Sequence, residues 1–260
     1  MDSVNKTLYI PLYGKAFVSR SGILLEDKMA ERIWEDSGFE LTGKSASKWL
    51  AYSMAMRAAV FDRWTARMLE ARPEAVVLHL GCGLDSRCQR VGGSNLWYDV
   101  DFPEVIGERQ KYFEQTANYR MIGGDLRQEA WLAEIPEGNT AIVAMEGVSM
   151  YLAPEELETL LCRLRSRFSE VHLLMDCYST FAAMASKHKN PVKEVGVSQV
   201  YGLDFPQILA GNVGYRFLRE HAIAPTTLIR QLKTGERILF SNLYAGKTAR
   251  KLYRIYELDA

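Results

Sequence analysis

The sequence predicts an α/β protein in which a doubly wound, mostly parallel sheet is covered by helices on both faces. Five short apolar runs alternate with helical segments, which is the pattern of strand–helix–strand units. The first run, residues 75–80, breaks into a turn with Gly81 and Gly83 and then starts a helix, as at the opening of nucleotide-binding sheets. A length of 260 residues suits one such domain with additions better than two independent domains.

The chain divides into four predicted parts of a single domain. Residues 1–45 have no clean period but are too apolar for a disordered tail, so we expect N-terminal helices that pack on the core or cover a pocket as a lid. Residues 46–177 form the expected ligand-binding core, and residues 178–214, with several Pro and Gly, an inserted cap. Residues 215–260 are expected to supply the last strands and helices, ending in an antiparallel pair of strands.

Each element of the core has a local signal. Residues 45–71 repeat apolar side chains at three- and four-residue steps, which predicts a long amphipathic helix that ends before Pro73. Proline also starts the helices expected at 103–113 and from Pro154, since it is tolerated in a first helical turn. The other expected elements are strands at 96–101, 119–124, 141–145, 171–177, 215–223 and 251–258, a short helix at 128–132 and helices within 226–247.

Composition and charge argue against several classes of function. Lys and Arg number 32 against 32 Asp and Glu, so the formal net charge of +0 indicates neither nucleic acid nor a membrane surface as a partner. The N-terminus lacks a signal sequence, and no run approaches the roughly 20 apolar residues of a membrane span, so we expect a cytoplasmic protein. Four cysteines stand singly, which predicts no metal site and a reducing compartment. The oligomeric state is not predicted.

Acidic residues follow three of the later apolar runs. Asp101, Asp125 and Glu146 stand at strand ends, and Asp85 lies in the glycine loop. A pyrophosphate in this negatively biased pocket would meet a repulsion of about 1 to 4 kcal/mol per close charge pair, and Ser86 occupies the third glycine position of a dinucleotide loop. S-adenosylmethionine has no phosphate and carries a sulfonium cation. The charge pattern therefore favours this cofactor over a nicotinamide dinucleotide.

Five motifs then follow one another along the chain: Arg57 with Asp62, and residues 80–87, 99–106, 124–126 and 145–152. In this order they resemble the leucine carboxyl methyltransferase and polyketide O-methyltransferase family, over about residues 47–176. The resemblance implies the class I methyltransferase fold, a Rossmann-like sheet of seven strands whose last strand is antiparallel. It also implies that S-adenosyl-L-methionine is the cofactor and that the chain is an O-methyltransferase.

The resemblance implies roles for individual residues. Arg57 would hold the methionine carboxylate, Asp101 the ribose hydroxyls and Glu146 the methionine ammonium. Tyr151 would face the substrate beside the methyl group and is the candidate catalytic residue. The other implied cofactor contacts are Gly81, Cys82, Gly83 and Asp85 in the glycine loop, Arg87 in the following helix, Phe102 after the second strand, Asp125 and Leu126 around the adenine, and Gly147.

Several of these residues have structural alternatives. Arg57 could be an ion-paired surface arginine, and Arg87 could hold the carboxylate or instead pair with Asp101 or Asp85. Asp101 could serve only to cap the helix that follows it. Tyr151 could be a core residue.

The acceptor is restricted in chemistry although the sequence does not identify it. His79 and His172 lie within apolar runs and are expected to be core residues, and no other residue marks itself as a strong base near the methyl site. A carboxylate needs no base, whereas a phenol with a pKa of about 10 would benefit from one. We therefore predict methylation of a carboxylate or acidic hydroxyl of a small, polyketide-like or aromatic molecule. The carboxyl of a protein C-terminus is the alternative acceptor.

Two other classes of protein would use the same glycine loop, namely an NAD(P)-dependent reductase and a non-catalytic nucleoside-binding protein. Calorimetry with S-adenosylhomocysteine and with NADH separates the first of them, and we expect only the thioether nucleoside to bind. Tight NADH binding without a response to S-adenosylhomocysteine would refute the prediction. A nucleoside sensor would bind S-adenosylmethionine yet consume none with any acceptor.

Overall fold

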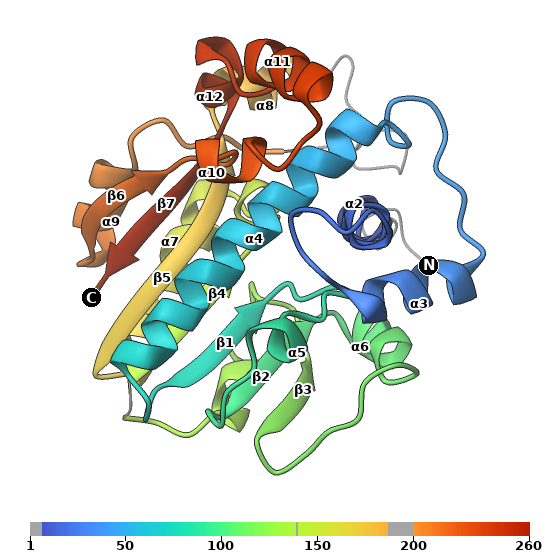
Figure 1. The fold of residues 1–260 in the computed structure, drawn as a ribbon. Helices are drawn as coiled ribbons and strands as arrows, with labels where there is room; N and C mark the ends of the chain where they lie inside the picture. Colours follow the sequence, from blue (N-terminus) through green and yellow to red (C-terminus); the bar gives the residue numbers. More distant parts are fainter. Residues whose placement is uncertain (1–6, 139, 187–199) are drawn as a thin grey trace.

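A computed structural model describes residues 7–138, 140–186 and 200–260. The strands within these ranges form one seven-stranded sheet with the order β3-β2-β1-β4-β5-β7-β6 (Figure 1). Their bounds are β1 (Val76–Leu80), β2 (Trp97–Asp101), β3 (Tyr119–Gly123), β4 (Thr140–Met145), β5 (Glu170–Tyr178), β6 (Arg216–His221) and β7 (Tyr253–Asp259). Strands β1 to β5 run parallel, whereas β7 is antiparallel to both of its neighbours. The predicted fold class is confirmed.

The order of the strands places a ligand crevice at the carboxyl ends of the central strands. β1 pairs in parallel with both β2 and β4. The chain moves from β1 outward to β2 and β3 and then returns to β4 on the other side. Loops that leave the carboxyl ends of β1 and β4 therefore diverge, and open α/β sheets bind their ligands at such a switch point.

Helices cover both faces of the sheet (Figure 1). On one face lies α4 (Lys48–Ala71), where Met56 and Phe61 join a core with Val77 of β1 and Ile142 of β4. On the other lies α7 (Pro154–Arg167). The remaining helices are α2 (Tyr9–Arg20), α3 (Lys28–Ser37), α5 (Arg87–Val91), α6 (Pro103–Arg109), α8 (Thr180–Ser186), α9 (Pro206–Val213), α10 (Thr226–Ile229), α11 (Thr234–Leu243) and α12 (Lys247–Leu252), with 3₁₀ turns η1 (Ala130–Glu134) and η2 (Ser149–Tyr151).

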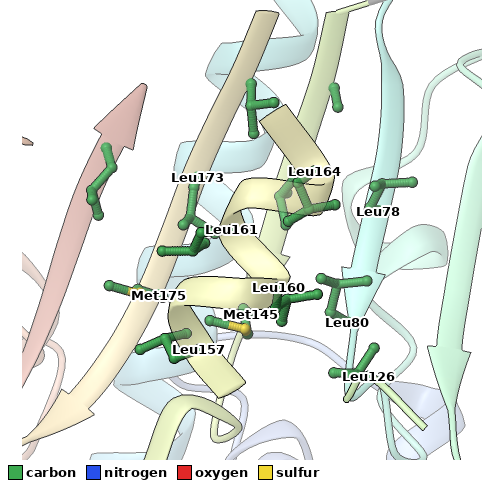
Figure 2. Packing of buried hydrophobic residues seen from close by; sticks show 14 of the residues in the cluster. Leu78, Leu80, Leu126, Met145, Leu157, Leu160, Leu161, Leu164, Leu173 and Met175 are labelled. Atoms are coloured by element: carbon green, nitrogen blue, oxygen red, sulfur yellow. The ribbon is translucent and has the colours of Figure 1, made fainter. Parts of the chain in front are cut away.

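The face of the sheet under α7 carries the larger leucine-rich core. Leu157, Leu160, Leu161 and Leu164 recur at helical spacing and are all buried, so α7 presents one apolar stripe to the sheet. Figure 2 shows this stripe packed over the strands, with side chains such as Met175 of β5 beneath it. Continuous burial on both faces explains why the central strands read as unbroken apolar runs.

The structure corrects three expected elements. α6 ends at Arg109 rather than at 113, because the backbone N–H groups of Lys111 and Tyr112 bond three residues back and loosen the helix into turns. The short helix expected at 128–132 is the 3₁₀ turn η1, which tucks Trp131 into the core. The terminal antiparallel pair is present, but β6 and β7 are separated in sequence by α10, α11 and α12 rather than by a short turn.

The N-terminal segment, which we expected to lack a clean period, forms two helices: α3 is amphipathic, with Ala30 and Ile33 on its buried side, whereas α2 shows no clear period. α2 packs against both α3 and α4, and most of its residues are buried. A helix that is covered on several sides lacks a polar face, so periodicity cannot reveal it. Of the predicted cap at 178–214, residues 187–199 lie outside the described residues.

Within the described ranges, no helix combines the length and the apolarity that crossing a membrane requires.

The packing of α7 can be tested with Leu161→Ala. Leu161 is fully buried, so the change should lower the free energy of unfolding by about 2 to 5 kcal/mol, measured by denaturant titration. Leu243→Ala is the matched control, because Leu243 is 63 % exposed and its removal should change stability by no more than about 0.5 kcal/mol. Equal effects of the two changes would contradict the assignment of α7 to the core.

Candidate cofactor-binding and active site

A cavity of about 820 Å³ opens at the carboxyl edge of the sheet. Loops after β1, β2, β3 and β4 bound it, together with α2, α4 and the segments around α11 and α12. The sequence-predicted residues that line it are Arg57, Gly81, Cys82, Gly83, Asp85, Asp101, Phe102, Asp125, Leu126, Glu146, Gly147 and Tyr151. Arg87 does not line it and is fully buried behind the wall. The structure thus brings together all the other predicted site residues, from five separate segments.

The glycine turn after β1 depends on close packing as well as on backbone geometry. Gly81 has φ +66°, and a Cβ there would lie 2.2 Å from Cγ2 of Val148. A side chain at Gly81 would therefore collide with the loop after β4. Gly83 has φ +52°, and its backbone N–H donates to Asp101 Oδ2 at 2.7 Å. The turn and the end of β2 are tied together by this bond.

Asp101 lies at the end of β2, and each of its carboxylate oxygens accepts one hydrogen bond from the protein backbone. Besides the bond from Gly83, its Oδ1 accepts from the backbone N–H of Phe102 at 2.8 Å. A carboxylate has about four acceptor positions, so each oxygen retains one for a ligand hydroxyl. Burial raises the pKa of Asp101 to about 6. Asp101 is not a helix cap, since the residue that caps α6 is Phe102 and its side chain makes no capping bond.

The predicted adenine end of the cavity carries Asp125 and Leu126 after β3. Arg127 donates to Asp125 through Nε, at 2.9 and 3.0 Å to the two carboxylate oxygens, through Nη2 at 2.5 Å, and through its backbone N–H at 3.0 Å. The Arg127 guanidinium lowers the pKa of Asp125. Asp125 is therefore an ionised acceptor beside the cavity.

Arg57 is a buried ion-paired residue and not a surface arginine. Its side chain is 7 % exposed, and Nε donates to Glu146 Oε1 at 2.8 Å. Nη1 donates to Asp176 Oδ2 at 3.0 Å and to the hydroxyl of Tyr253. Nη2 makes no hydrogen bond to any residue that the structure describes, and it lies beside Gly147. One edge of the guanidinium thus remains for a carboxylate ligand, as the sequence predicts for the methionine end.

Arg87 lies beneath the site and holds two of its acids. It donates to Asp62 Oδ1 at 2.9 Å and to Glu146, and lies 3.2 Å from Asp85. Among the alternatives, pairing with Asp85 is confirmed, and pairing with Asp101 is wrong. Its other nitrogen, Nη1, contacts Nε2 of His79, so this histidine is a buried core residue, as predicted.

The expected excess of negative charge in the pocket is largely cancelled. Lys15 and Arg90 approach Asp85 at 3.5 and 2.6 Å, respectively. Burial alone would raise the pKa of Asp85, but these cations hold it well below its ordinary value. The pKa of Glu146 is likewise lowered against its burial by Arg57 and Arg87. The acidic residues at the strand ends therefore predict a stronger preference for a cationic ligand than the paired charges of the folded site support.

Three site residues escaped sequence reasoning: Lys15, Asp176 and Tyr253. Lys15 is buried in α2, which has no visible period. Asp176 could have been found, because it is an acidic residue near the carboxyl end of the fifth apolar run, close to the position that the other acids have in theirs. Tyr253 begins β7 and had no local signal. Tyr151, by contrast, was predicted and lies in the wall, where burial raises the pKa of its phenol.

A seven-stranded sheet with an antiparallel β7, a glycine turn after β1 and an acid at the end of β2 define the class of S-adenosylmethionine-dependent methyltransferases with the class I fold. Residues 3–165 match the model of the leucine carboxyl methyltransferase family. The chain belongs to this family and is an S-adenosylmethionine-dependent methyltransferase.

Named relatives agree with this assignment. The tetracenomycin polyketide synthesis O-methyltransferase of Streptomyces glaucescens is 28 % identical over 242 residues, covering 91 % of this chain and 89 % of that protein. An S-adenosyl-L-methionine-dependent methyltransferase of Gibberella zeae is 26 % identical over 237 residues, covering 82 % and 80 %.

Solved structures share the fold. A putative methyltransferase from Thermobifida fusca superposes with a TM-score of 0.57 at 14 % identity, covering 94 % of this chain and 93 % of that one. The magnesium protoporphyrin IX methyltransferase of Synechocystis PCC 6803 with bound S-adenosylhomocysteine gives 0.52 at 16 % identity, covering 89 % and 92 %.

The role of Asp101 can be tested through the pH dependence of cofactor binding. A pKa of about 6 means that the carboxyl takes up a proton as the pH falls from 7.5 to 5, and it then loses acceptor positions for the ribose. Calorimetry should show weaker S-adenosylhomocysteine binding at the lower pH. Asp101→Asn and Asp101→Ala should weaken binding at pH 7.5 by about tenfold or more and flatten the pH dependence.

Asp125→Asn is the matched control for this experiment. The pKa of Asp125 is lowered by Arg127, so its carboxylate stays ionised over the same range. The pH dependence should therefore persist in that variant. An unchanged dissociation constant in Asp101→Ala would count against the ribose assignment.

Proposed function

We propose that this enzyme transfers the methyl group of S-adenosylmethionine to an oxygen of a small, polyketide-like or aromatic molecule. The observation that carries the proposal is that a single cavity contains both the cofactor-side residues and an apolar, aromatic region. That region includes Leu50, Met54, Tyr178, Ile223, Tyr244 and Leu252. Small-molecule sites typically measure about 300 to 1,000 Å³, and the 820 Å³ here leaves room for an acceptor beside a cofactor.

The wall of the apolar region is braced by aromatic contacts between distant segments. Trp49 of α4 stacks on Tyr244 after α11 with ring centroids 5.7 Å apart, and Tyr244 stacks in turn on Phe240 at 5.6 Å. These contacts support a wall of constant shape, which suits a rigid ring system. The named polyketide-synthesis relative also favours an acceptor of this kind.

The residues of the site suit orientation and exclusion of water rather than covalent chemistry. S-adenosylmethionine supplies a methyl group on a sulfonium that leaves as a neutral thioether. In our proposal Arg57 holds the methionine carboxylate through Nη2, Glu146 lies beside the ammonium, and Asp101 holds the ribose. Aligning an acceptor oxygen behind the methyl group can contribute up to about 7 to 11 kcal/mol.

Tyr151 is the proposed substrate-facing residue. Burial raises the pKa of its phenol, so the group is neutral near pH 7 and can donate a hydrogen bond to the acceptor but does not act as a base. It lies in the cavity wall immediately after the loop of Glu146 and Gly147. This position supports a role beside the methyl group.

We also propose a cytoplasmic location. All four cysteines are unpaired, which suits a compartment that keeps thiols reduced.

The acceptor class can be tested with a panel of hydroxylated polycyclic aromatics, aromatic carboxylic acids and a peptide with a free C-terminal leucine. We expect mass spectrometry to show a methyl group on aromatic members and formation of S-adenosylhomocysteine, with the peptide unmodified. The reaction without acceptor is the control. Methylation of the peptide alone would favour a protein C-terminal carboxyl, and no transfer to any member would refute the proposed acceptor class.

A further inference from the structure

His221 and Glu257 form a hydrogen-bonded pair at the antiparallel end of the sheet. His221 ends β6, and its Nε2 lies 2.6 Å from Oε2 of Glu257 on the adjacent β7. Nε of Arg219 approaches the same carboxylate oxygen at 2.9 Å. The side chain of Glu257 is 5 % exposed and that of His221 is 17 % exposed. His221 lines the cavity and Glu257 supports it from behind.

The carboxylate determines which nitrogen of His221 carries the hydrogen. Burial alone would raise the pKa of Glu257, but the hydrogen bond with His221 and the charge of Arg219 lower it to about 2. Glu257 is therefore ionised near pH 7 and can only accept hydrogen bonds, so His221 donates from Nε2. The other ring nitrogen, Nδ1, makes no hydrogen bond to any residue that the structure describes. His221 thus keeps one nitrogen for a ligand.

The register of β6 and β7 places His221 on the face of the sheet that α4 covers. His221 lies opposite Ile255, whose side chain belongs to the core under α4. Residues directly opposite each other in an antiparallel pair point to the same face. Glu220 lies opposite Tyr256, which belongs to the core under α7, and Arg254 is 3.9 Å from it. The side chain of Glu220 therefore leaves the strand on the other face, away from the imidazole.

His221 lies across the apolar region from the cofactor residues. Since β7 is antiparallel to both neighbours, β6 ends at the same edge of the sheet as β4, which Glu146 follows. Neighbouring strands are about 4.8 Å apart, so the three spacings from β4 to β6 amount to roughly 14 Å. Tyr178 at the end of β5 and Leu252 before β7 lie between them and belong to the apolar region. An acceptor in that region therefore has the cofactor residues at one end and His221 at the other.

His221 is also the group that can carry a positive charge at this end of the cavity. Among the described lining residues, the cationic side chains of Lys15, Arg57 and Arg127 lie at the cofactor side. Histidine side chains in general change charge between about pH 5 and 8. An imidazole can therefore bind an acid as the acceptor of its proton or as a cation beside its anion, and both forms place one proton between nitrogen and oxygen.

We propose that His221, held by Glu257, binds an acidic group of the acceptor at the end of the cavity opposite the cofactor, so that the natural substrate carries such a group apart from the oxygen that is methylated. This inference rests on the proposed function and extends it by a second functional group on the acceptor. It applies equally to a methylated carboxyl and to a methylated hydroxyl group. The ionised Glu257 balances the positive charge that the imidazole carries beside the acidic group.

The test uses a naphthol series and a naphthoic acid series, whose members carry a sulfonate, a neutral sulfonamide or no substituent on the opposite ring. A sulfonate stays anionic throughout the pH range of the assay. We expect the wild type to have a lower KM for the sulfonated member of each series than for the sulfonamide. His221→Gln retains a donor for Glu257 but cannot become a cation, so it should reduce this preference by about 10- to 100-fold, the usual weight of a hydrogen bond to a charged group.

A binding experiment gives a readout that does not depend on turnover. The sulfonated naphthol is titrated into the complex with S-adenosylhomocysteine at pH 7.5 in buffers of different ionisation enthalpy. Because the anion favours the protonated imidazole, the wild type should take up protons on binding and His221→Gln should not. Arg219→Gln is the matched control, since Arg219 contacts the same oxygen of Glu257 but does not line the cavity, and it should retain the proton uptake. Thermal unfolding reports whether each variant folds.

Three outcomes would overturn the role of His221. The wild type could have equal KM values for the sulfonated and sulfonamide acceptors. His221→Gln could keep the wild-type preference, or it could lose the same factor in KM on every acceptor, which would assign His221 to the packing of β6. Transfer to none of the acceptors, with proton uptake that still depends on His221, would instead count against the proposed function and support the binding site.

Discussion

The position of Glu146 between two buried arginines is the constraint on which the rest of the site depends. Arg57 from α4 and Arg87 from α5 both donate to this carboxylate at the end of β4. Removing one member of a buried pair leaves an uncompensated charge, at a cost of about 3 to 5 kcal/mol. Two helices and a strand from distant parts of the chain must therefore meet in one arrangement. Asp176 on β5 and Tyr253 on β7 extend the same cluster to the antiparallel side of the sheet.

Among the described residues of the site, this arrangement leaves few polar positions without a protein partner, and those that remain belong to residues that line the cavity. Arg57 keeps Nη2, and Asp101 keeps one acceptor position on each carboxylate oxygen. Because the other hydrogen-bond donors and acceptors of these groups are bonded to protein partners, the groups are already oriented before a ligand binds. Pre-orientation of this kind reduces the reorganisation that binding and reaction require. The site thus offers a ligand a few oriented hydrogen-bonding positions rather than an excess of negative charge.

The fold was predictable wherever burial leaves a periodic or continuous apolar signal. The strands β1 to β5 read as apolar runs because both of their faces are covered, and α4 and α7 show the spacing of helices that lie on a sheet. The signal fails for α2, which is buried on most sides, and for η1, whose short length holds no full period. Helix ends such as that of α6 depend on local hydrogen bonds that composition does not record.

The sequence by itself determined the class of the sheet, the glycine turn and the residues of the cofactor loops, because these lie in short motifs whose local conformation their own residues dictate. It did not reveal that Arg87 points away from the cavity, or that Lys15, Asp176 and Tyr253 belong to the site. Their roles depend on which elements become neighbours: β5 and β7 pair although α8, α9, β6, α10, α11 and α12 lie between them in the described sequence. Pairing of buried charges is a property of that tertiary arrangement, since each partner is chosen by proximity in space rather than along the chain.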